Sequence, residues 1–153
     1  MSIEKRLYEA KRWVSTARDD MDTADILKEK GKFAHACFHS QQAGEKAIKA
    51  IWYFLDADPW GHSIQRLIED LESVDGNVYQ VLKKLIRRGM VLDRYYIPTR
   101  YPNGLPDITP DLAFSQEDAD IGITYAREII SHVATILNLN KVTKLTETTK
   151  PSK

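Results

Sequence analysis

The chain has 153 residues, of which 42% are hydrophobic and 29% are charged, a balance that is ordinary for a globular protein with one buried core. Its 22 basic and 22 acidic side chains cancel at neutral pH. The overall charge therefore gives no sign of a polyanionic partner, and only a local cluster of basic residues could do so.

The location of the protein can be predicted from what the sequence lacks. No stretch approaches the roughly 18 apolar residues that span a membrane, and the first residues contain no signal-peptide core. The single cysteine, Cys37, cannot form an internal disulfide. We therefore expect no contact with a membrane and a reducing, cytoplasmic setting.

Residues 33–55 contain no proline and have the periodicity of an amphipathic helix. The middle of the apolar face is built from small residues, Ala43, Gly44 and Ala47. Small residues let neighbouring helices approach closely. We expect this helix to be the buried central element of a helical bundle.

The same kind of apolar periodicity predicts four further helices, near residues 3–30, 63–72, 78–93 and 116–137. Gly31 is a natural stop after the first, and Ser115 with Asp118 resembles a capping box before the last. The predicted fold class is all-α, an antiparallel up-and-down bundle of four to five helices. It would form one domain over residues 1–138, followed by a flexible C-terminal tail at 139–153.

Between residues 95 and 114 we expect no regular structure, because four prolines recur every four residues. A loop this long in a compact domain is often functional. Residues 83–101, which lead into it, hold six basic side chains against one acid, Asp93, and three tyrosines.

Arginine can contact phosphate through two parallel hydrogen bonds, and tyrosine can stack on a base. The candidate ligand-binding residues are Arg87, Arg94, Tyr95, Tyr96, Arg100 and Tyr101. Two interpretations are open. The segment binds a nucleotide or RNA, or it is a solvated basic helix face followed by aromatic side chains that hold the loop on the core.

Three motifs in order identify a family resemblance: QQAGEKAIKA at 41–50, GHSIQRL at 61–67 and LDRYYIPTRYPNG at 92–104. With the flanking helices, they resemble the HEPN domain family (higher eukaryotes and prokaryotes nucleotide-binding) over roughly residues 5 to 137. The resemblance implies an all-α bundle that commonly forms a homodimer, in a prokaryotic context. It also implies a minimal nucleotidyltransferase as partner subunit, in a toxin–antitoxin or defence-type system.

Many HEPN proteins are metal-independent ribonucleases in which four to six residues separate an arginine from a histidine. Arg127 and His132 have that spacing, and would be the catalytic pair if the resemblance extends to this activity. The alternative is a surface arginine and a histidine that packs between helices.

We expect no metal and no cofactor. His35 and His39 share a helix face, but no third ligand accompanies them, and the glycine-rich phosphate loops are absent. Three hypotheses remain: a nucleotide- or RNA-binding HEPN module beside a nucleotidyltransferase, a ribonuclease toxin that uses Arg127 and His132, or a structural homodimer without a ligand.

Overall fold

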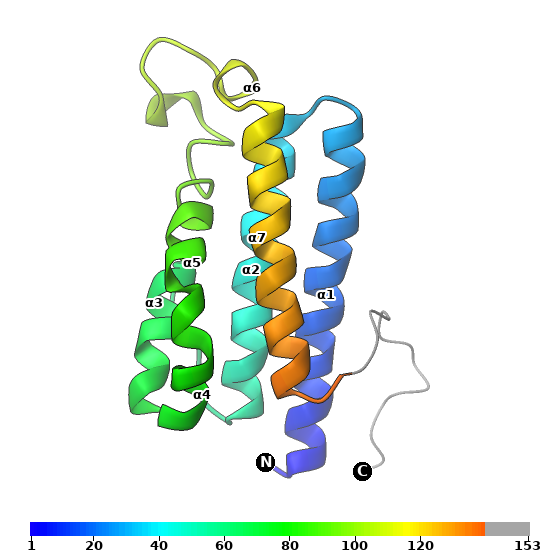
Figure 1. The fold of residues 1–153 in the computed structure, drawn as a ribbon, viewed down its shortest axis with the longest axis vertical. Helices are drawn as coiled ribbons and strands as arrows, with labels where there is room; N and C mark the ends of the chain where they lie inside the picture. Colours follow the sequence, from blue (N-terminus) through cyan, green and yellow to red (C-terminus); the bar gives the residue numbers. More distant parts are fainter. Residues whose placement is uncertain (140–153) are drawn as a thin grey trace.

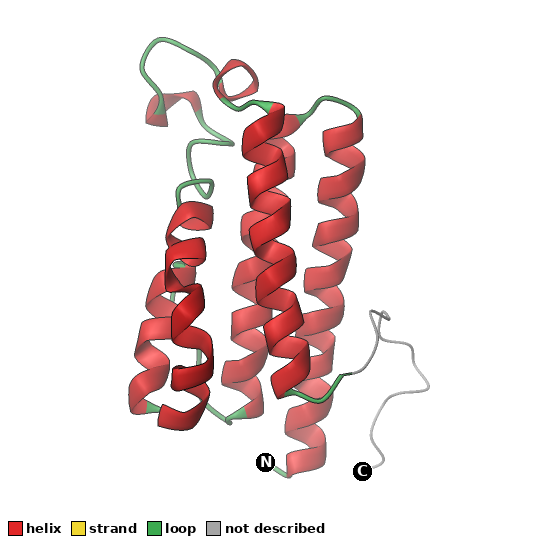
Figure 2. Cartoon of the chain, in the orientation of Figure 1, coloured by secondary structure: helices red, strands yellow, loops and turns green. Residues whose placement is uncertain are grey.

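The computed structural model describes residues 1–139, and helices are the only regular elements in that range (Figures 1 and 2). The predicted all-α bundle is therefore confirmed. The tail expected at 139–153 lies, apart from Leu139, outside the described residues. No helix of the described part is long and apolar enough to cross a membrane.

Three long helices lie side by side: α1 (Ile3–Glu29), α2 (Phe33–Phe54) and α7 (Gln116–Ile136) (Figure 1). The turn between α1 and α2 is closed by Gly31, whose φ of 74° suits glycine. The amide of Gly31 donates to the carbonyl of Lys28 at 3.0 Å, and that of Lys32 to Leu27 at 2.8 Å. This pair of bonds ends a helix at a glycine, which confirms the predicted stop.

The start of α7 also follows the prediction. The Ser115 side chain accepts a hydrogen bond from the Asp118 amide at 3.3 Å, and the Asp118 carboxylate accepts one from the Ser115 amide at 2.9 Å. This reciprocal capping box satisfies two amides that otherwise have no partner at a helix start.

The shorter elements pack on the other side of α2. They are α3 (Ile64–Glu69), η1 (Asp70–Ser73), α4 (Gly76–Leu82), η2 (Lys83–Leu85) and α5 (Ile86–Asp93). The prediction of one continuous helix at 78–93 is wrong, because the tighter 3₁₀ turn η2 interrupts the helix. The turn redirects the chain so that Leu82, Leu85 and Leu92 are all buried while α5 lies beside α3 (Figure 1).

The proline-rich stretch is less irregular than predicted. It contains a 3₁₀ turn, η3 (Pro102–Gly104), and a short helix, α6 (Pro110–Ala113). Both begin with proline, whose fixed φ suits the first helical position and whose missing N–H costs nothing there. The prolines that prevent a long helix therefore start two short ones.

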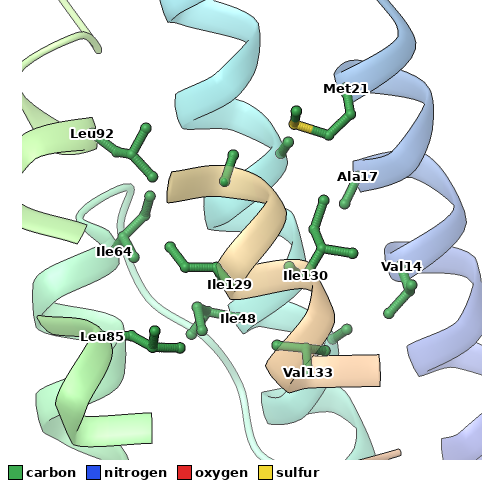
Figure 3. Packing of buried hydrophobic residues seen from close by; sticks show 14 of the residues in the cluster. Val14, Ala17, Met21, Ile48, Ile64, Leu85, Leu92, Ile129, Ile130 and Val133 are labelled. Atoms are coloured by element: carbon green, nitrogen blue, oxygen red, sulfur yellow. The ribbon is translucent and has the colours of Figure 1, made fainter. Parts of the chain in front are cut away.

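The core confirms α2 as the central helix, since it packs against α1, α3, α5 and α7. Figure 3 shows apolar side chains from all these elements meeting around it. Gly44 lies where α3, α5 and α7 approach α2 closely. A Cβ at this position would be 2.9 Å from Ile64 Cδ1, 3.2 Å from Leu92 Cδ1 and 3.5 Å from Ile129 Cδ1.

Gly89 on α5 is a second point of close approach and gives the first prediction. A Cβ there would be 2.8 Å from Ile64 Cγ2 and 3.2 Å from the backbone nitrogen of Gln65, which cannot move alone. Gly89→Ala should lower the free energy of unfolding in urea by ~1–3 kcal/mol, because it overpacks the α3–α5 contact.

Gly76→Ala is the matched control, since a Cβ at Gly76 would meet nothing within 4 Å. It should change stability by no more than ~0.5 kcal/mol. Equal stabilities of the two variants would show that the α3–α5 contact is looser than the structure indicates.

Candidate functional site

The partly buried carboxylate of Asp93 ties the start of α3 to the end of α5. Its Oδ1 accepts the Ile64 amide at 2.8 Å, and its Oδ2 accepts the Ser63 hydroxyl at 2.9 Å and the Gln65 amide at 3.1 Å. A carboxylate suits a helix start because free amides point outward there. This contact joins the GHS motif to the LDRYY motif.

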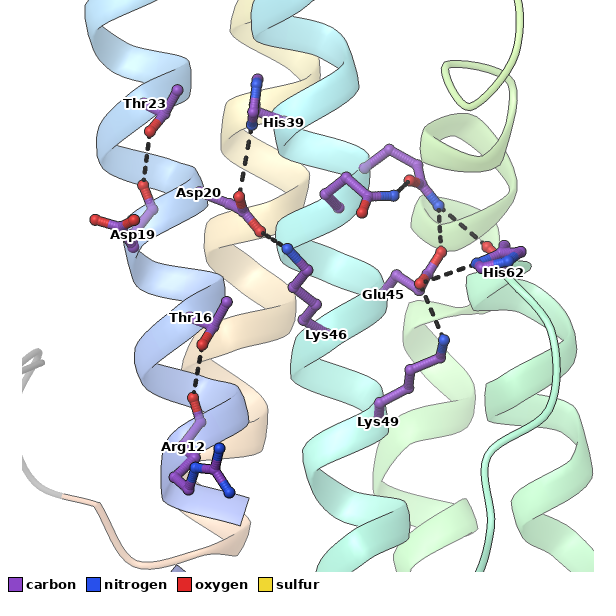
Figure 4. Close-up of polar contacts among 12 residues, drawn as sticks. Arg12, Thr16, Asp19, Asp20, Thr23, His39, Glu45, Lys46, Lys49 and His62 are labelled. Atoms are coloured by element: carbon purple, nitrogen blue, oxygen red, sulfur yellow. Dashed lines mark hydrogen bonds and ion pairs between the residues drawn. The ribbon is translucent and has the colours of Figure 1, made fainter. Parts of the chain in front are cut away.

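Glu45 of α2 is a more deeply buried carboxylate, only 4% exposed, and Figure 4 shows side chains converging on it. Its Oε2 accepts a hydrogen bond from Lys49 Nζ at 3.1 Å and lies 3.3 Å from His62 Nδ1. Its Oε1 accepts one from Gln41 Nε2 at 3.3 Å, which also donates to the His62 carbonyl at 3.1 Å. Gln42 Nε2 donates to Gln41 Oε1 at 2.8 Å. The QQAGEK motif thus holds the GHS loop in place.

The third motif contributes an aromatic layer over this network. The rings of His62 and Tyr96 stack, with centroids 5.0 Å apart and 17° between their planes. The Arg100 guanidinium lies 4.4 Å from the Phe38 ring centroid, 4.7 Å from that of Tyr96 and 5.2 Å from that of Tyr101. We call these five residues the Arg100 cluster.

Arg100 is held in place but retains hydrogen-bonding capacity. Its Nε donates to the Tyr96 carbonyl at 2.8 Å. Within residues 1–139, no hydrogen bond or ion pair engages its two terminal nitrogens. Those nitrogens carry four N–H groups in a planar fork, the geometry that suits phosphate or carboxylate. The arrangement can bind an anion with little further ordering.

The two neighbouring tyrosines point to different environments. Tyr95 is 4% exposed and its ring packs edge-on against Phe114, with centroids 5.8 Å apart. Burial raises the pKa of its hydroxyl. Its carbonyl accepts a hydrogen bond from the buried Thr99 hydroxyl. Tyr95 therefore anchors the loop to the core, and the proposed stacking surface is left to Tyr96 and Tyr101.

Arg87 and Arg94 are exposed, on α5 and at its C-cap. Their seven-residue separation puts them on one side of the helix. In the part of the chain that the structure describes, neither makes a ring contact or ion pair with the Arg100 cluster. The structure thus brings together Tyr96, Arg100 and Tyr101 of the predicted residues, and adds Phe38 and His62.

Sequence reasoning missed Glu45, Phe38 and His62 as parts of a site. Glu45 and His62 lie in two of the motifs that carried the family resemblance, and that was the available signal. Nothing in the local sequence shows that Glu45 contacts His62 or that Arg100 lies over the ring of Phe38.

Cys37 and the possible metal ligands are weaker candidates for a catalytic or metal-binding role. Cys37 is fully buried, and burial, followed by the charge of Asp118, raises its pKa to about 12, so its thiolate is inaccessible at neutral pH. Among residues 1–139, no three His, Cys, Asp or Glu side chains lie where they could hold a metal ion.

Comparison with known proteins places these features in a family. The profile of the HEPN domain matches residues 10–137. The chain belongs to the HEPN domain family. A comparison with curated proteins finds no match.

Three crystal structures have the same HEPN fold. TT1696 from Thermus thermophilus is 35% identical, with a TM-score of 0.75 over 83% of this chain and 97% of that one. ST0689, an archaeal HEPN homologue, is 29% identical, with a TM-score of 0.69 over 84% and 98%. The HEPN domain protein tm0613 from Thermotoga maritima is 29% identical, with a TM-score of 0.63 over 82% and 97%.

Arg127 and His132, which have the HEPN ribonuclease spacing, both lie on α7 but contact different residues. Arg127 Nη2 lies 2.5 Å from Asp25 Oδ2 on α1. His132 Nδ1 donates to the Glu128 carbonyl at 2.7 Å, and the Glu128 side chain pairs with Arg88 on α5. An offset of five positions along the helix puts the two side chains about 140° apart around the axis. Within one chain they do not form a pair.

The pH dependence of stability tests the Asp93 contact. Burial raises the pKa of Asp93 above its ordinary 3.8, and outweighs the hydrogen bonds that lower it. The folded chain then binds the proton more tightly than the unfolded chain, so Asp93 makes the free energy of unfolding fall as the pH rises from about 3.8 through the raised value.

Asp93→Asn removes this titration. The difference in free energy of unfolding, wild type minus variant, should therefore decrease from pH 3.5 to pH 7 in urea titrations. Asp75→Asn, which alters the cap of α4, controls for the loss of a helix-capping carboxylate. A difference that grows with pH would contradict the effect of burial on Asp93.

Proposed function

We propose that this HEPN chain is a nucleotide- or RNA-binding module whose main phosphate contact is Arg100. It acts beside a minimal nucleotidyltransferase subunit in a toxin–antitoxin or defence-type system. The observation that carries the binding proposal is the guanidinium of Arg100, held against three rings with four N–H groups free of partners in the described chain.

The surroundings of Arg100 match the two parts of a nucleotide. The fork can take two phosphate oxygens, and the rings beneath it keep the charge in a fixed orientation. Tyr101 is 50% exposed and offers a face on which a base can stack. Arg94 and Arg87 are exposed cations that could contact further phosphates of an RNA strand.

The same geometry favours binding over cleavage. The groups around Arg100 are aromatic rings and one histidine, His62, whose Nδ1 is directed at Glu45. Of the candidate catalytic pair on α7, Arg127 is paired with Asp25 of α1, and His132 Nδ1 donates to the Glu128 carbonyl of its own helix. A protein that binds RNA without cutting it fits this arrangement.

Binding assays with Arg100 variants test the proposal. A labelled single-stranded RNA and ATP should each bind the wild type saturably, and more weakly as salt rises because the contacts are to phosphate. Arg100→Ala should cost ~1–3 kcal/mol of binding free energy for the lost charged hydrogen bonds. Arg100→Lys should recover only part, because lysine keeps the charge and loses the fork.

Arg66→Ala is the matched control, since Arg66 is an exposed arginine of α3 paired only with Asp70, and its affinity should match the wild type. Equal binding by Arg100→Ala and the wild type would disprove the site. RNA cleavage that disappears in His132→Ala would favour the ribonuclease alternative.

Homodimerisation is part of the proposal. The family resemblance supports it, and so do large apolar side chains exposed on different elements: Trp60 is 90%, Leu112 74% and Ile26 58% exposed. Light scattering at micromolar concentration should give twice the 17.5 kDa mass of one chain. A mass of 17.5 kDa would show that these side chains serve another purpose.

A further inference from the structure

His62 of the Arg100 cluster is held by one ring nitrogen and leaves the other one open. Its Nδ1 lies 3.3 Å from Glu45 Oε2, and Gln41 Nε2 donates to its backbone carbonyl at 3.1 Å (Figure 4). The side chain of His62 is nevertheless 59% exposed. Within residues 1–139, no hydrogen bond or ion pair engages its Nε2.

The contact at Nδ1 decides which ring nitrogen of His62 carries the hydrogen. The carboxylate of Glu45 can only accept hydrogen bonds, so in the neutral imidazole Nδ1 carries the hydrogen and Nε2 carries a lone pair. An imidazole changes its charge between pH 5 and 8. The added proton therefore binds to Nε2 and converts this acceptor into a charged donor.

His62 and Arg100 contact the same aromatic ring. The imidazole stacks on Tyr96 with centroids 5.0 Å apart, and the guanidinium carbon of Arg100 lies 4.7 Å from the centroid of that ring. These two distances together are shorter than the Debye length of ~10 Å at 0.1 M salt, so both groups act on the same anion. A protonated His62 thus gives the Arg100 site a second positive charge.

Two further ionisable groups face His62 from the neighbouring helices. On α2, Lys49 Nζ donates to the same Glu45 oxygen at 3.1 Å, so the ammonium and the carboxylate balance each other. On α5, Asp93 accepts the hydroxyl of Ser63 and two amides of α3. The charge that His62 gains on protonation therefore meets no unengaged acid among residues 1–139, and a bound anion can neutralise it.

We propose that His62 is a second phosphate contact of the Arg100 site, which forms when Nε2 is protonated, and that Glu45 is its positioning residue. The inference rests on the proposed function, because it adds a residue to the same site. A phosphate oxygen accepts the hydrogen bond from Nε2 and stabilises the charged imidazole, so that binding takes up a proton. By linkage, the affinity for RNA rises as the pH falls.

The test is a binding titration of the full chain with a short labelled RNA that has hydroxyl groups at both ends, at constant ionic strength. Every phosphate of this RNA is a diester with a constant single charge, whereas a phosphate monoester gains a second charge near pH 6 and would mask the effect. The wild type should bind the RNA at least about fivefold more tightly at pH 6 than at pH 8, since a charged hydrogen bond is gained.

His62→Gln replaces the imidazole with a polar group that cannot become charged. It should bind RNA within about twofold of the wild type at pH 8 and lose the gain at pH 6. His39→Gln is the matched control. His39 packs edge-on against Phe38 but lies 3.5 Å from Asp20 of α1, so this variant should keep the full pH dependence.

Glu45→Gln tests the positioning role. The gain in affinity should move to lower pH in this variant, because a neutral amide stabilises the charged imidazole less than a carboxylate does. A ring-nitrogen NMR spectrum of the wild type at pH 8 should show the hydrogen of His62 on Nδ1. A hydrogen on Nε2 would contradict the arrangement.

The outcomes separate this inference from the proposed function. Equal wild-type affinity at pH 6 and pH 8, with Arg100→Ala still binding more weakly, would overturn the role of His62 and leave the nucleotide site standing. An unchanged gain in His62→Gln would also overturn it, by assigning the pH effect to another group. The absence of RNA binding at both pH values would overturn this inference and the proposed function together.

Discussion

The close approach of three helices to Gly44 fixes the arrangement of the bundle. Ile64 of α3, Leu92 of α5 and Ile129 of α7 all reach within 3.5 Å of where a Cβ would lie. Only a residue without a side chain allows three elements to pack there at once. Asp93 adjoins Leu92 and caps α3, so the position of the Arg100 cluster depends on this contact as well.

One edge of α2 carries a polar stripe, Gln41, Glu45 and Lys49, next to this apolar packing. Apolar side chains of similar size would often stabilise a core as well as a buried ion pair does. The stripe instead holds His62, through its backbone carbonyl and its ring, under the ring of Tyr96. We interpret the stripe as a network that orients the loop rather than one that chiefly adds stability.

The long helices and their ends could be predicted from sequence because the determinants are local. Gly31 ends α1 and the Ser115 capping box begins α7 through contacts within a few residues. The break at Lys83–Leu85 could not be predicted, because the apolar pattern continues through it and the redirection comes from packing against α3. The site was less predictable still, because its contacts are long-range. Of the adjacent residues Tyr95 and Tyr96, one ring enters the core and the other covers His62, a difference that depends on how the loop lies on α2 and α7.

Four arginines of this electrically neutral chain, Arg12, Arg66, Arg88 and Arg127, each pair with an acid. Arg100 has no acidic partner among residues 1–139. For Arg100 three rings compensate part of the charge, since cation–π contacts contribute ~0.5–2 kcal/mol each. The cost of leaving Arg100 without an acid is offset if an anion binds from outside. For Arg100, half-buried beside exposed aromatic rings, a nucleotide phosphate fits.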